Sequence, residues 1–218
     1  ELEIDSATHA FGARKVLKGA WLKCRGGEII GLLGRNGCGK STLLQILFGT
    51  QQADFRALFL NGKPLARPYL IPGLIAYLPQ PSFLPRYLRV RQAIRLFGGR
   101  QGLEKLSREP RILEMLATRV SQLSGGEKRF LELGLILSLD RLFVLLDEPF
   151  SELEPLYKQR VREWIKEEAA AGKGIVVTDH DYRQILEVGQ RVVLMTQGQT
   201  RPVANLKELD RIYLPLDT

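Results

Sequence analysis

The chain has 218 residues, of which 44% are hydrophobic and 26% charged, so it holds enough apolar side chains for a buried core. No stretch approaches the roughly 18 uninterrupted apolar residues of a membrane-spanning helix, so no such helix is predicted. The net charge of +8 fits either a well-solvated surface or attraction to anionic lipid or nucleic acid. Basic residues do not alternate with aromatic ones, however, and stacking on single-stranded nucleic acid is therefore not favoured.

The first part of the chain, residues 1–65, has the pattern of short strands joined by tight turns. Its apolar runs are brief and are interrupted by glycines, at 15–24, 28–34 and 56–65. The stretch 41–49 changes to helical spacing and ends in a glycine, a residue that commonly terminates helices. The pattern predicts a strand-rich start followed by one helix.

Prolines crowd the segment 64–85, which predicts loops and edges around one short strand at 74–78. Residues 86–122 then mix polar and apolar side chains with helical periodicity, which is clearest at 88–97 and 110–120. This middle segment is predicted to form a small helical lobe that is inserted into the α/β body.

The second half of the chain alternates helices with apolar strands. Continuous apolar runs of strand length are typical of strands buried on both faces of a parallel sheet. The expected order is helix 124–139, strand 141–147, helix 154–173, strand 174–180, helix 182–189 and strand 190–198. This alternation predicts a parallel, doubly wound sheet.

A glycine-rich loop between a predicted strand and a predicted helix carries the clearest chemical signal. It reads G-x-x-x-x-G-K-S, and the motif requires this setting. Its glycines let backbone N–H groups surround phosphate oxygens, and the helix start adds a positive potential. Lys40 can reach the β- and γ-phosphates, and the Ser41 hydroxyl can bind Mg²⁺. The predicted nucleotide-binding residues here are Gly34, Arg35, Asn36, Gly37, Cys38, Gly39, Lys40, Ser41 and Thr42.

Polar side chains also follow three other predicted strands. Asp147 is placed to hold Mg²⁺, and Glu148 is free to polarise an attacking water. His180 can contact the γ-phosphate or that water, and Gln80 can accept from water or bind Mg²⁺. Each of these residues alone is weak evidence, because a solvated turn or local packing explains it equally well. His9 has no such setting and is predicted to lie on the surface.

The stretch LSGGEKR at Leu123–Arg129 resembles a second anion site. Ser124 and the two glycines that follow it, Gly125 and Gly126, precede a predicted helix. Bare glycine N–H groups at a helix start, together with a serine hydroxyl, can bind a phosphate without a lysine. The same residues also fit an ordinary helix cap, in which Ser124 and Glu127 form a capping box. The two roles are compatible.

The order of phosphate loop, Gln loop, LSGGE, LLDEP and His resembles that of the ATP-binding-cassette (ABC) ATPases, over about Phe11 to Met195. The resemblance implies an α/β P-loop NTPase fold with a RecA-like parallel sheet core, an N-terminal antiparallel β subdomain and an inserted helical subdomain. The implied parts of a single ABC ATPase domain, 1–218, are a catalytic core with the β subdomain (1–80 and 123–195), a helical subdomain (81–122) and a C-terminal tail (196–218).

The same resemblance implies that two copies meet head to tail. Each ATP then lies between the phosphate loop of one subunit and Ser124–Gly126 of the other. Phe11 takes the place of the aromatic residue, commonly Tyr, that stacks on adenine. Glu154 stands where the family's interface loop usually has Asp. Glu148, His180 and Lys40 are the implied catalytic residues, and Ser41, Gln80 and Asp147 the implied Mg²⁺ ligands.

The leading functional hypothesis is the ATP-hydrolysing subunit of a membrane transporter, with separate permease subunits as partners. The resemblance implies that the face of the Gln80 loop and the inserted helices, roughly Pro81–Phe97, receives their coupling helix. Two scattered cysteines and the lack of a leader-like N-terminus predict a cytoplasmic protein, peripheral on the inner face of the cell membrane. The alternatives are a soluble ABC-type ATPase, for example in cluster assembly, and a small-molecule kinase. Nucleic acid is not an expected partner, and the transported substrate and its direction do not follow from the sequence.

Overall fold

The computed structural model describes residues 1–205 and residue 209. Its N-terminal part is an antiparallel sheet of β1 (Leu2–Phe11), β2 (Arg14–Cys24), β4 (Phe55–Leu60) and β5 (Lys63–Pro64), in the order β2-β1-β4-β5. The sequence predicts a strand-rich start over 1–65, but no individual strand was placed at the position of β1. Its alternation of apolar and polar residues is interrupted where Ser6 adopts a φ of 51° and the pairing register with β2 shifts. Bulges of this kind conceal the two-residue period on which sequence reasoning depends.

A second sheet has the order β10-β9-β3-β8-β7-β6 and forms the centre of the molecule. Its strands are β3 (Ile29–Leu33), β6 (Ile75–Leu78), β7 (Phe143–Asp147), β8 (Gly174–Thr178), β9 (Arg191–Thr196) and β10 (Gln199–Pro202). All the pairs are parallel except that of β9 with β10, as the alternation of helices and strands predicts. β10 lies in the segment predicted to be a tail, 196–218, which extends beyond the described residues.

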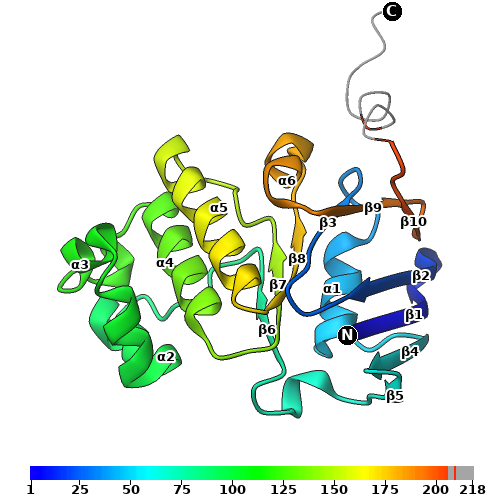
Figure 1. Cartoon of the computed structure of the whole chain (residues 1–218), viewed down its shortest axis with the longest axis horizontal. Coiled ribbons are helices and arrows are strands. Elements are labelled where there is room, and N and C mark those ends of the chain that lie inside the picture. The colour runs from blue at the N-terminus through cyan, green and yellow to red at the C-terminus, as the bar shows by residue number, and fades with distance from the viewer. Residues whose placement is uncertain (206–208, 210–218) are drawn as a thin grey trace, which may run out of the picture.

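Alternate residues of β3 belong to two different hydrophobic clusters. Ile30 and Leu32 pack with α1 (Lys40–Phe48) and the antiparallel sheet, whereas Ile29 and Leu33 pack in the cluster that contains the helices at 125–138 and 155–170. Figure 1 shows the resulting layers: α4 (Gly125–Ser138), α5 (Pro155–Ala170) and α6 (Tyr182–Val188) on one side of the central sheet, α1 on the other. Both faces of the sheet are thus covered, which explains its continuous apolar strands.

The helical lobe lies at the far end of the molecule from the antiparallel sheet (Figure 1). It contains α2 (Val90–Leu106) and α3 (Pro110–Met115), and α2 packs against α4. α2 consists of two helical pieces joined at Gly99, whose φ of 65° and ψ of −158° are not helical. The expected helix at 110–120 is shorter than predicted, and the 3₁₀ turn η2 (Val120–Gln122) follows it. A further 3₁₀ turn, η1 (Pro68–Leu70), lies within the proline-rich segment.

Among the residues that the structure describes, no helix is long and apolar enough to span a bilayer.

The two cysteines differ in their surroundings, which predicts a difference in reactivity. Cys24 is 1% exposed, and burial raises the pKa of its thiol to about 12, so it stays protonated at neutral pH. Cys38 is only partly buried. Iodoacetamide at pH 8 should therefore alkylate Cys38 in the native protein and Cys24 only after unfolding in urea, as measured by peptide mass spectrometry. A Cys38→Ser variant that still reacted rapidly in its native state would contradict this assignment.

Candidate functional site

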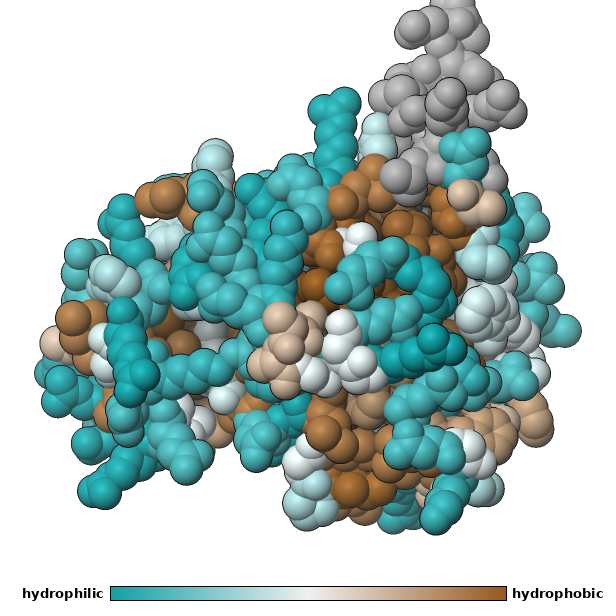
Figure 2. Space-filling model, in the orientation of Figure 1, coloured by the Kyte–Doolittle hydropathy of each residue, from teal (hydrophilic) through white to brown (hydrophobic). Residues whose placement is uncertain are grey.

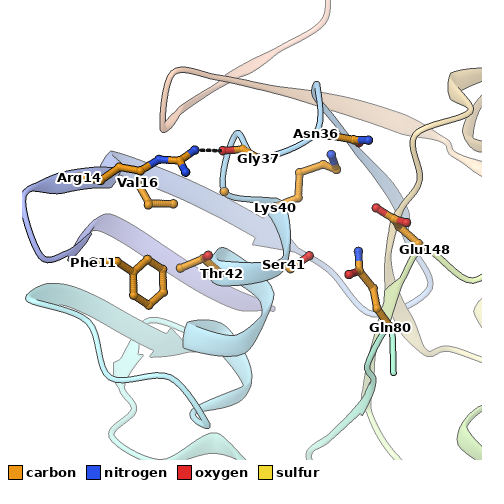
Figure 3. A pocket seen from close by; sticks show the side chains of 11 residues that line it. Phe11, Arg14, Val16, Asn36, Gly37, Lys40, Ser41, Thr42, Gln80 and Glu148 are labelled. Atoms are coloured by element: carbon orange, nitrogen blue, oxygen red, sulfur yellow. Dashed lines mark hydrogen bonds between the residues drawn. The ribbon is translucent and has the colours of Figure 1, made fainter. Parts of the chain in front are cut away.

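The predicted site residues come from loops at one edge of the central sheet. β3 leads into the phosphate loop, β6 into Gln80, β7 into Glu148 and β8 into His180. Because these strands are parallel, their carboxyl ends lie at the same edge, where ligands bind in open α/β sheets. Figure 3 shows the side chains of Lys40, Ser41, Gln80 and Glu148 around a common space.

The backbone of the phosphate loop requires glycine at Gly39. This residue caps the start of α1 with φ 113° and ψ 8°, in the left-handed region. A Cβ added to Gly39 would lie 2.8 Å from Leu17 Cδ2 and 3.2 Å from the Val16 carbonyl oxygen. Only glycine therefore lets the loop pass this close to β2 and then enter α1.

A cavity of about 520 Å³ lies beside this loop. Lys40 is 5% exposed, and its ammonium donates to the Gly34 carbonyl oxygen at 2.7 Å. The cavity is open enough at its mouth that Phe11 remains 52% exposed. Eight of the predicted nucleotide-binding residues line it: Phe11, Asn36, Gly37, Gly39, Lys40, Ser41, Thr42 and Gln80. Glu148, predicted to be catalytic, lines it as well.

Three predicted residues of the loop, Gly34, Arg35 and Cys38, do not line this cavity. Arg35 and Cys38 instead line a separate cavity of about 580 Å³ together with Met195. A Cβ on Gly34 would meet the Met195 carbonyl oxygen at 2.5 Å and Cys38 Sγ at 2.6 Å. The side chains of Arg35 and Cys38 thus point away from the cavity of the phosphate loop. Only the backbone groups of these two residues can contact a nucleotide bound there.

Asp147 joins the loop to the sheet. It is 1% exposed, and its Oδ1 accepts hydrogen bonds from Ser41 Oγ at 3.1 Å and Thr178 Oγ1 at 2.9 Å. Its Oδ2 accepts from the Tyr77 hydroxyl at 3.0 Å. Burial raises the pKa of the Asp147 carboxyl, although the three hydroxyl donors oppose the shift. The predicted Mg²⁺ ligands Ser41 and Asp147 are therefore in direct contact.

Glu148 follows Asp147 in a backbone conformation that is unusual for its residue type. Its φ is 48°, and its N–H donates to Thr178. The Glu148 side chain is 22% exposed, and its Oε2 lies 3.8 Å from Nδ1 of His180, a residue that is 57% exposed. The same imidazole nitrogen is 3.4 Å from Asp179 Oδ1. Strained conformations of this kind persist where the surrounding structure fixes them, often at functional sites.

The LSGGE segment forms a second cavity of about 320 Å³, lined in part by Gly125. Gln80 and Glu148 line this cavity as well as the first one. Ser124 Oγ accepts the Glu127 N–H and Glu127 Oε2 accepts the Ser124 N–H, so the predicted capping box is confirmed. Ser124, Gly125 and Gly126 do not line the cavity of the phosphate loop within this one chain.

Gly126 also has a packing role that the sequence did not reveal. A Cβ there would lie 2.9 Å from the backbone oxygen of Glu152, and one on Gly125 would lie 2.7 Å from Glu152 Oε2. Glu152 itself has a φ of 63°. The loop that contains Glu152 thus packs on the start of α4, and the close approach of its backbone to Gly126 requires glycine whether or not a phosphate binds.

Comparison with known proteins identifies the family. The ABC transporter family model matches residues 17–151. A sulfate/thiosulfate import ATP-binding protein of Methylococcus capsulatus is 32% identical over 95% of this chain, which spans 64% of that relative. The chain belongs to the ABC transporter family. A lipopolysaccharide export system ATP-binding protein of Haemophilus influenzae is 28% identical over 98% of this chain and 96% of the relative.

Solved structures show the same ABC fold. The ATP-binding subunit of an ABC transporter has a TM-score of 0.84 with 24% identity and covers 98% of this chain and 95% of its own. A nucleotide-free cassette from an ABC transporter has a TM-score of 0.81 with 20% identity, covering 99% and 95%. These likenesses confirm the predicted P-loop NTPase fold.

Within this ABC fold, Arg129 is a site residue that sequence reasoning missed. It is 6% exposed, and its guanidinium donates to the carbonyl oxygens of Pro79 at 2.7 Å, Asp147 at 2.6 Å and Glu148 at 3.1 Å. Glu132 is 1% exposed, and its Oε2 lies 3.6 Å from Arg129 Nη1. In sequence Arg129 follows a lysine and has the pattern of a solvated charge, so nothing marked it as buried.

Glu132 extends this connection to the Gln loop of the ABC domain. Its Oε1 accepts the Ser82 hydroxyl at 2.5 Å and the Phe83 N–H at 3.2 Å. The pair Arg129–Glu132 therefore ties α4 to the segments that carry Gln80 and Glu148. No sequence signal distinguishes such a buried pair from an exposed i,i+3 pair on a helix.

His9 lies close to the nucleotide cavity of the ABC domain, which corrects the prediction that it is a surface residue. It is 7% exposed, and its ring meets that of Phe11 edge-on at a centroid distance of 4.6 Å. The position is buried because β1 turns this face toward the β-subdomain core. Arg14, also missed, lines the same cavity, and its Nη2 donates to the Gly37 carbonyl oxygen at 3.4 Å (Figure 3).

The Arg129–Glu132 pair yields a stability prediction. Arg129→Met leaves a buried carboxylate without its cation and should lower the free energy of unfolding by about 3–5 kcal/mol. The double variant Arg129→Met/Glu132→Met buries no unpaired charge. Its free energy of unfolding should therefore fall by less than the sum of the decreases caused by Arg129→Met and Glu132→Met alone. Urea unfolding measures each value, with Lys128→Met as the neighbouring control. Strict additivity of the single variants would contradict the proposed coupling.

Proposed function

We propose that this chain is the ATP-binding and ATP-hydrolysing subunit of a membrane transporter and works with separate membrane subunits. One observation carries the proposal: a single cavity holds the Lys40 ammonium, the Ser41 hydroxyl and the Glu148 carboxylate at the carboxyl edge of the sheet. Relatives with sequence similarity over nearly the whole chain are ATP-binding proteins of import and export systems. Since both directions occur among them, the comparisons do not assign a direction or a substrate to this chain.

The proposed reaction is the hydrolysis of ATP to ADP and phosphate. The Glu148 carboxylate accepts a hydrogen bond from water and orients it for in-line attack on the γ-phosphorus. The bond from phosphorus to the bridging oxygen of the β-phosphate breaks, and Lys40 stabilises the negative charge that develops on the phosphate oxygens. His180, 3.8 Å from the carboxylate, is positioned to hydrogen-bond the same water or the γ-phosphate.

The residues around Ser41 fit a Mg²⁺ ion that accompanies the nucleotide. Its hydroxyl, the Asp147 carboxylate and the Gln80 amide supply the oxygen ligands that Mg²⁺ prefers, and the first two are already in contact. No cluster of three His, Cys, Asp or Glu side chains suited to a metal occurs in the described residues. A hydrated Mg²⁺ that is bound mainly by phosphates needs no such cluster. When bound, the ion would be held by Ser41, Asp147 and Gln80 and would neutralise negative charge on the phosphates.

The proposal includes a head-to-tail dimer. Ser124–Gly126 present a capped helix start, with Ser124 and Gly125 exposed, outside the phosphate-loop cavity of their own chain. A second copy can bring this helix start to the γ-phosphate, where its N–H groups and the Ser124 hydroxyl bind the anion. Hydrolysis then removes the shared ligand, and the two copies separate, which transmits the nucleotide state to the membrane subunits. Such a protein acts in the cytoplasm, at the inner face of the membrane.

Glu148→Gln tests the role of the proposed water-orienting carboxylate. The amide keeps the shape of the side chain but is a far weaker base, so ATP turnover should fall about 100-fold or more while ATP binding persists. Dimers should accumulate with ATP and not with ADP, as measured by light scattering after gel filtration. Glu114→Gln, on the surface of the helical lobe, is the control. Undiminished turnover by Glu148→Gln would refute the assignment.

Lys40→Ala tests the phosphate-binding loop. Removing an ammonium that contacts phosphate should weaken ATP binding by roughly 10- to 100-fold, because charge-assisted hydrogen bonds contribute about 1.5–3 kcal/mol. Adenosine, which has no phosphate, should bind the variant and the native chain alike. Isothermal titration calorimetry measures both affinities. An ATP affinity equal to that of the native chain would place the triphosphate elsewhere.

A further inference from the structure

His9 is a buried polar residue beside the nucleotide cavity, and the proposed reaction does not use it. It belongs to β1 and is 7% exposed. Its Nδ1 atom is buried and has no hydrogen-bond partner among the described residues. A buried polar atom without a partner is unfavourable and therefore rare in native structures. An apolar side chain of similar size would avoid this cost, so the imidazole ring must contribute something else.

One side of the His9 ring contacts Phe11. The two residues are two apart on β1, so their side chains lie on the same face of the strand. Their ring centroids are 4.6 Å apart and their planes make an angle of 85°, which is a favourable arrangement for aromatic pairs. A single ring in this position leaves at least one face of the Phe11 ring uncovered. That face is available to a planar base.

Exposure alone does not mark Phe11 as part of a site. Other apolar side chains are also exposed, as the brown areas among hydrophilic residues in Figure 2 show. Phe11 differs from them because it lines the nucleotide cavity while its ring contacts a buried one. In Figure 3 it lies at the opposite end of the cavity from Glu148, where the base of a nucleotide is expected.

The loop that follows α1 holds the imidazole nitrogens of His9. Gln51 Nε2 lies 3.2 Å from His9 Nε2 and also donates to the Gln52 carbonyl oxygen at 3.1 Å. Since an amide nitrogen only donates, His9 Nε2 accepts, and the proton of the neutral ring is on Nδ1. Asp54 Oδ1 lies 3.7 Å from that nitrogen, beyond hydrogen-bond distance. The Asp54 N–H donates to the Thr8 carbonyl oxygen at 3.0 Å, which ties the same loop to β1.

This loop is in turn fixed to the end of α1. Three consecutive backbone N–H groups donate to the Gln45 carbonyl oxygen, at 2.8, 3.0 and 3.2 Å: those of Gly49, Thr50 and Gln51. α1 begins at Lys40, in the phosphate loop. The same helix therefore carries phosphate-binding groups at its start and, through Gln51, holds His9 beside its end.

We propose that His9 is a positioning residue for the adenine base, because it holds the Phe11 ring on which the base stacks. The inference rests on the proposed function, in which this cavity binds ATP, and it adds the residue that fixes the base. A freely moving aromatic side chain must be ordered when a ligand binds, and this ordering weakens binding. A ring that His9 holds in advance avoids that loss.

The variants His9→Leu and His9→Phe form a matched pair. Both remove the unpaired Nδ1 and the contact with Gln51, but only His9→Phe keeps an aromatic ring beside Phe11. His9→Leu should bind ATP roughly two- to tenfold more weakly than the native chain, whereas His9→Phe should stay within about twofold of it. Isothermal titration calorimetry measures the affinities, and the thermal unfolding midpoint verifies that each variant is folded.

Inorganic tripolyphosphate separates the base from the phosphates. It has no base, so its affinity should be the same for the native chain, His9→Leu and His9→Phe. In steady-state ATP hydrolysis, His9→Leu should raise KM and leave kcat unchanged, because the base is remote from the γ-phosphate. Phe55→Leu is the control. It makes the same kind of change at a residue of β4 that is 58% exposed and pairs with Thr8 of β1, and it should bind ATP like the native chain.

A double variant tests whether His9 acts through Phe11. Phe11→Leu removes the ring on which the base stacks and should itself weaken ATP binding. Adding His9→Leu to Phe11→Leu should then cause no further loss, because there is no ring left to position.

Each contrary outcome has a separate meaning. Equal ATP affinities of His9→Leu and the native chain, or equal losses in His9→Leu and His9→Phe, would overturn the role of the His9 ring. A parallel loss of tripolyphosphate affinity, or a further loss in the double variant, would show that His9 acts elsewhere than on Phe11 and would overturn it too. An unchanged ATP affinity of Phe11→Leu would overturn both this inference and the stacking role of Phe11. The proposed function would fail only if the native chain did not bind ATP.

Discussion

The carboxylate of Asp147 is the interaction on which the site depends. It accepts hydroxyl hydrogen bonds from Ser41, Tyr77 and Thr178, which belong to α1, β6 and β8, while Asp147 itself ends β7. Burying a carboxylate is unfavourable unless hydrogen bonds satisfy it. The three hydrogen bonds fix the positions of α1, β6, β7 and β8 relative to one another. This arrangement places the phosphate loop opposite Glu148.

A second buried charge connects that arrangement to the rest of the molecule. The Arg129 guanidinium binds the carbonyl oxygens of Pro79, Asp147 and Glu148, and Glu132 holds Ser82 and Phe83. Gln80 and Glu148 in turn line both the phosphate-loop cavity and the cavity at the start of α4. Hydrogen bonds and one ion pair therefore connect the backbone of Asp147 and Glu148 to α4 and to Ser82 and Phe83, and α2 of the helical lobe packs on α4.

The sequence predicts those features that depend on local pattern. The apolar run at 141–147, the helix that ends at Gly49 and the capping box of Ser124 and Glu127 are all present, because burial, chain reversal and capping act on neighbouring residues. The strand edge where Ser41, Gln80 and Glu148 meet was also predictable, since parallel strands must end together.

Features that depend on distant contacts were not predictable. The bulges of β1 interrupt the two-residue alternation by which a strand is predicted from sequence. His9 is buried only because that strand turns it inward. In the sequence, Arg129 has the pattern of a surface charge. Its burial results from the packing of α4 against the Gln loop, which the sequence pattern does not show. The side chains of Arg35 and Cys38 belong to a nucleotide-binding motif, yet they line another cavity because Gly34 passes close to Met195.

The most direct test of the whole account is a structure of the Glu148→Gln variant with ATP. It should show the triphosphate against Lys40 and Ser41, with Ser124 of a second copy on the γ-phosphate. ATP bound in an isolated chain, with Ser124 facing solvent, would contradict the account.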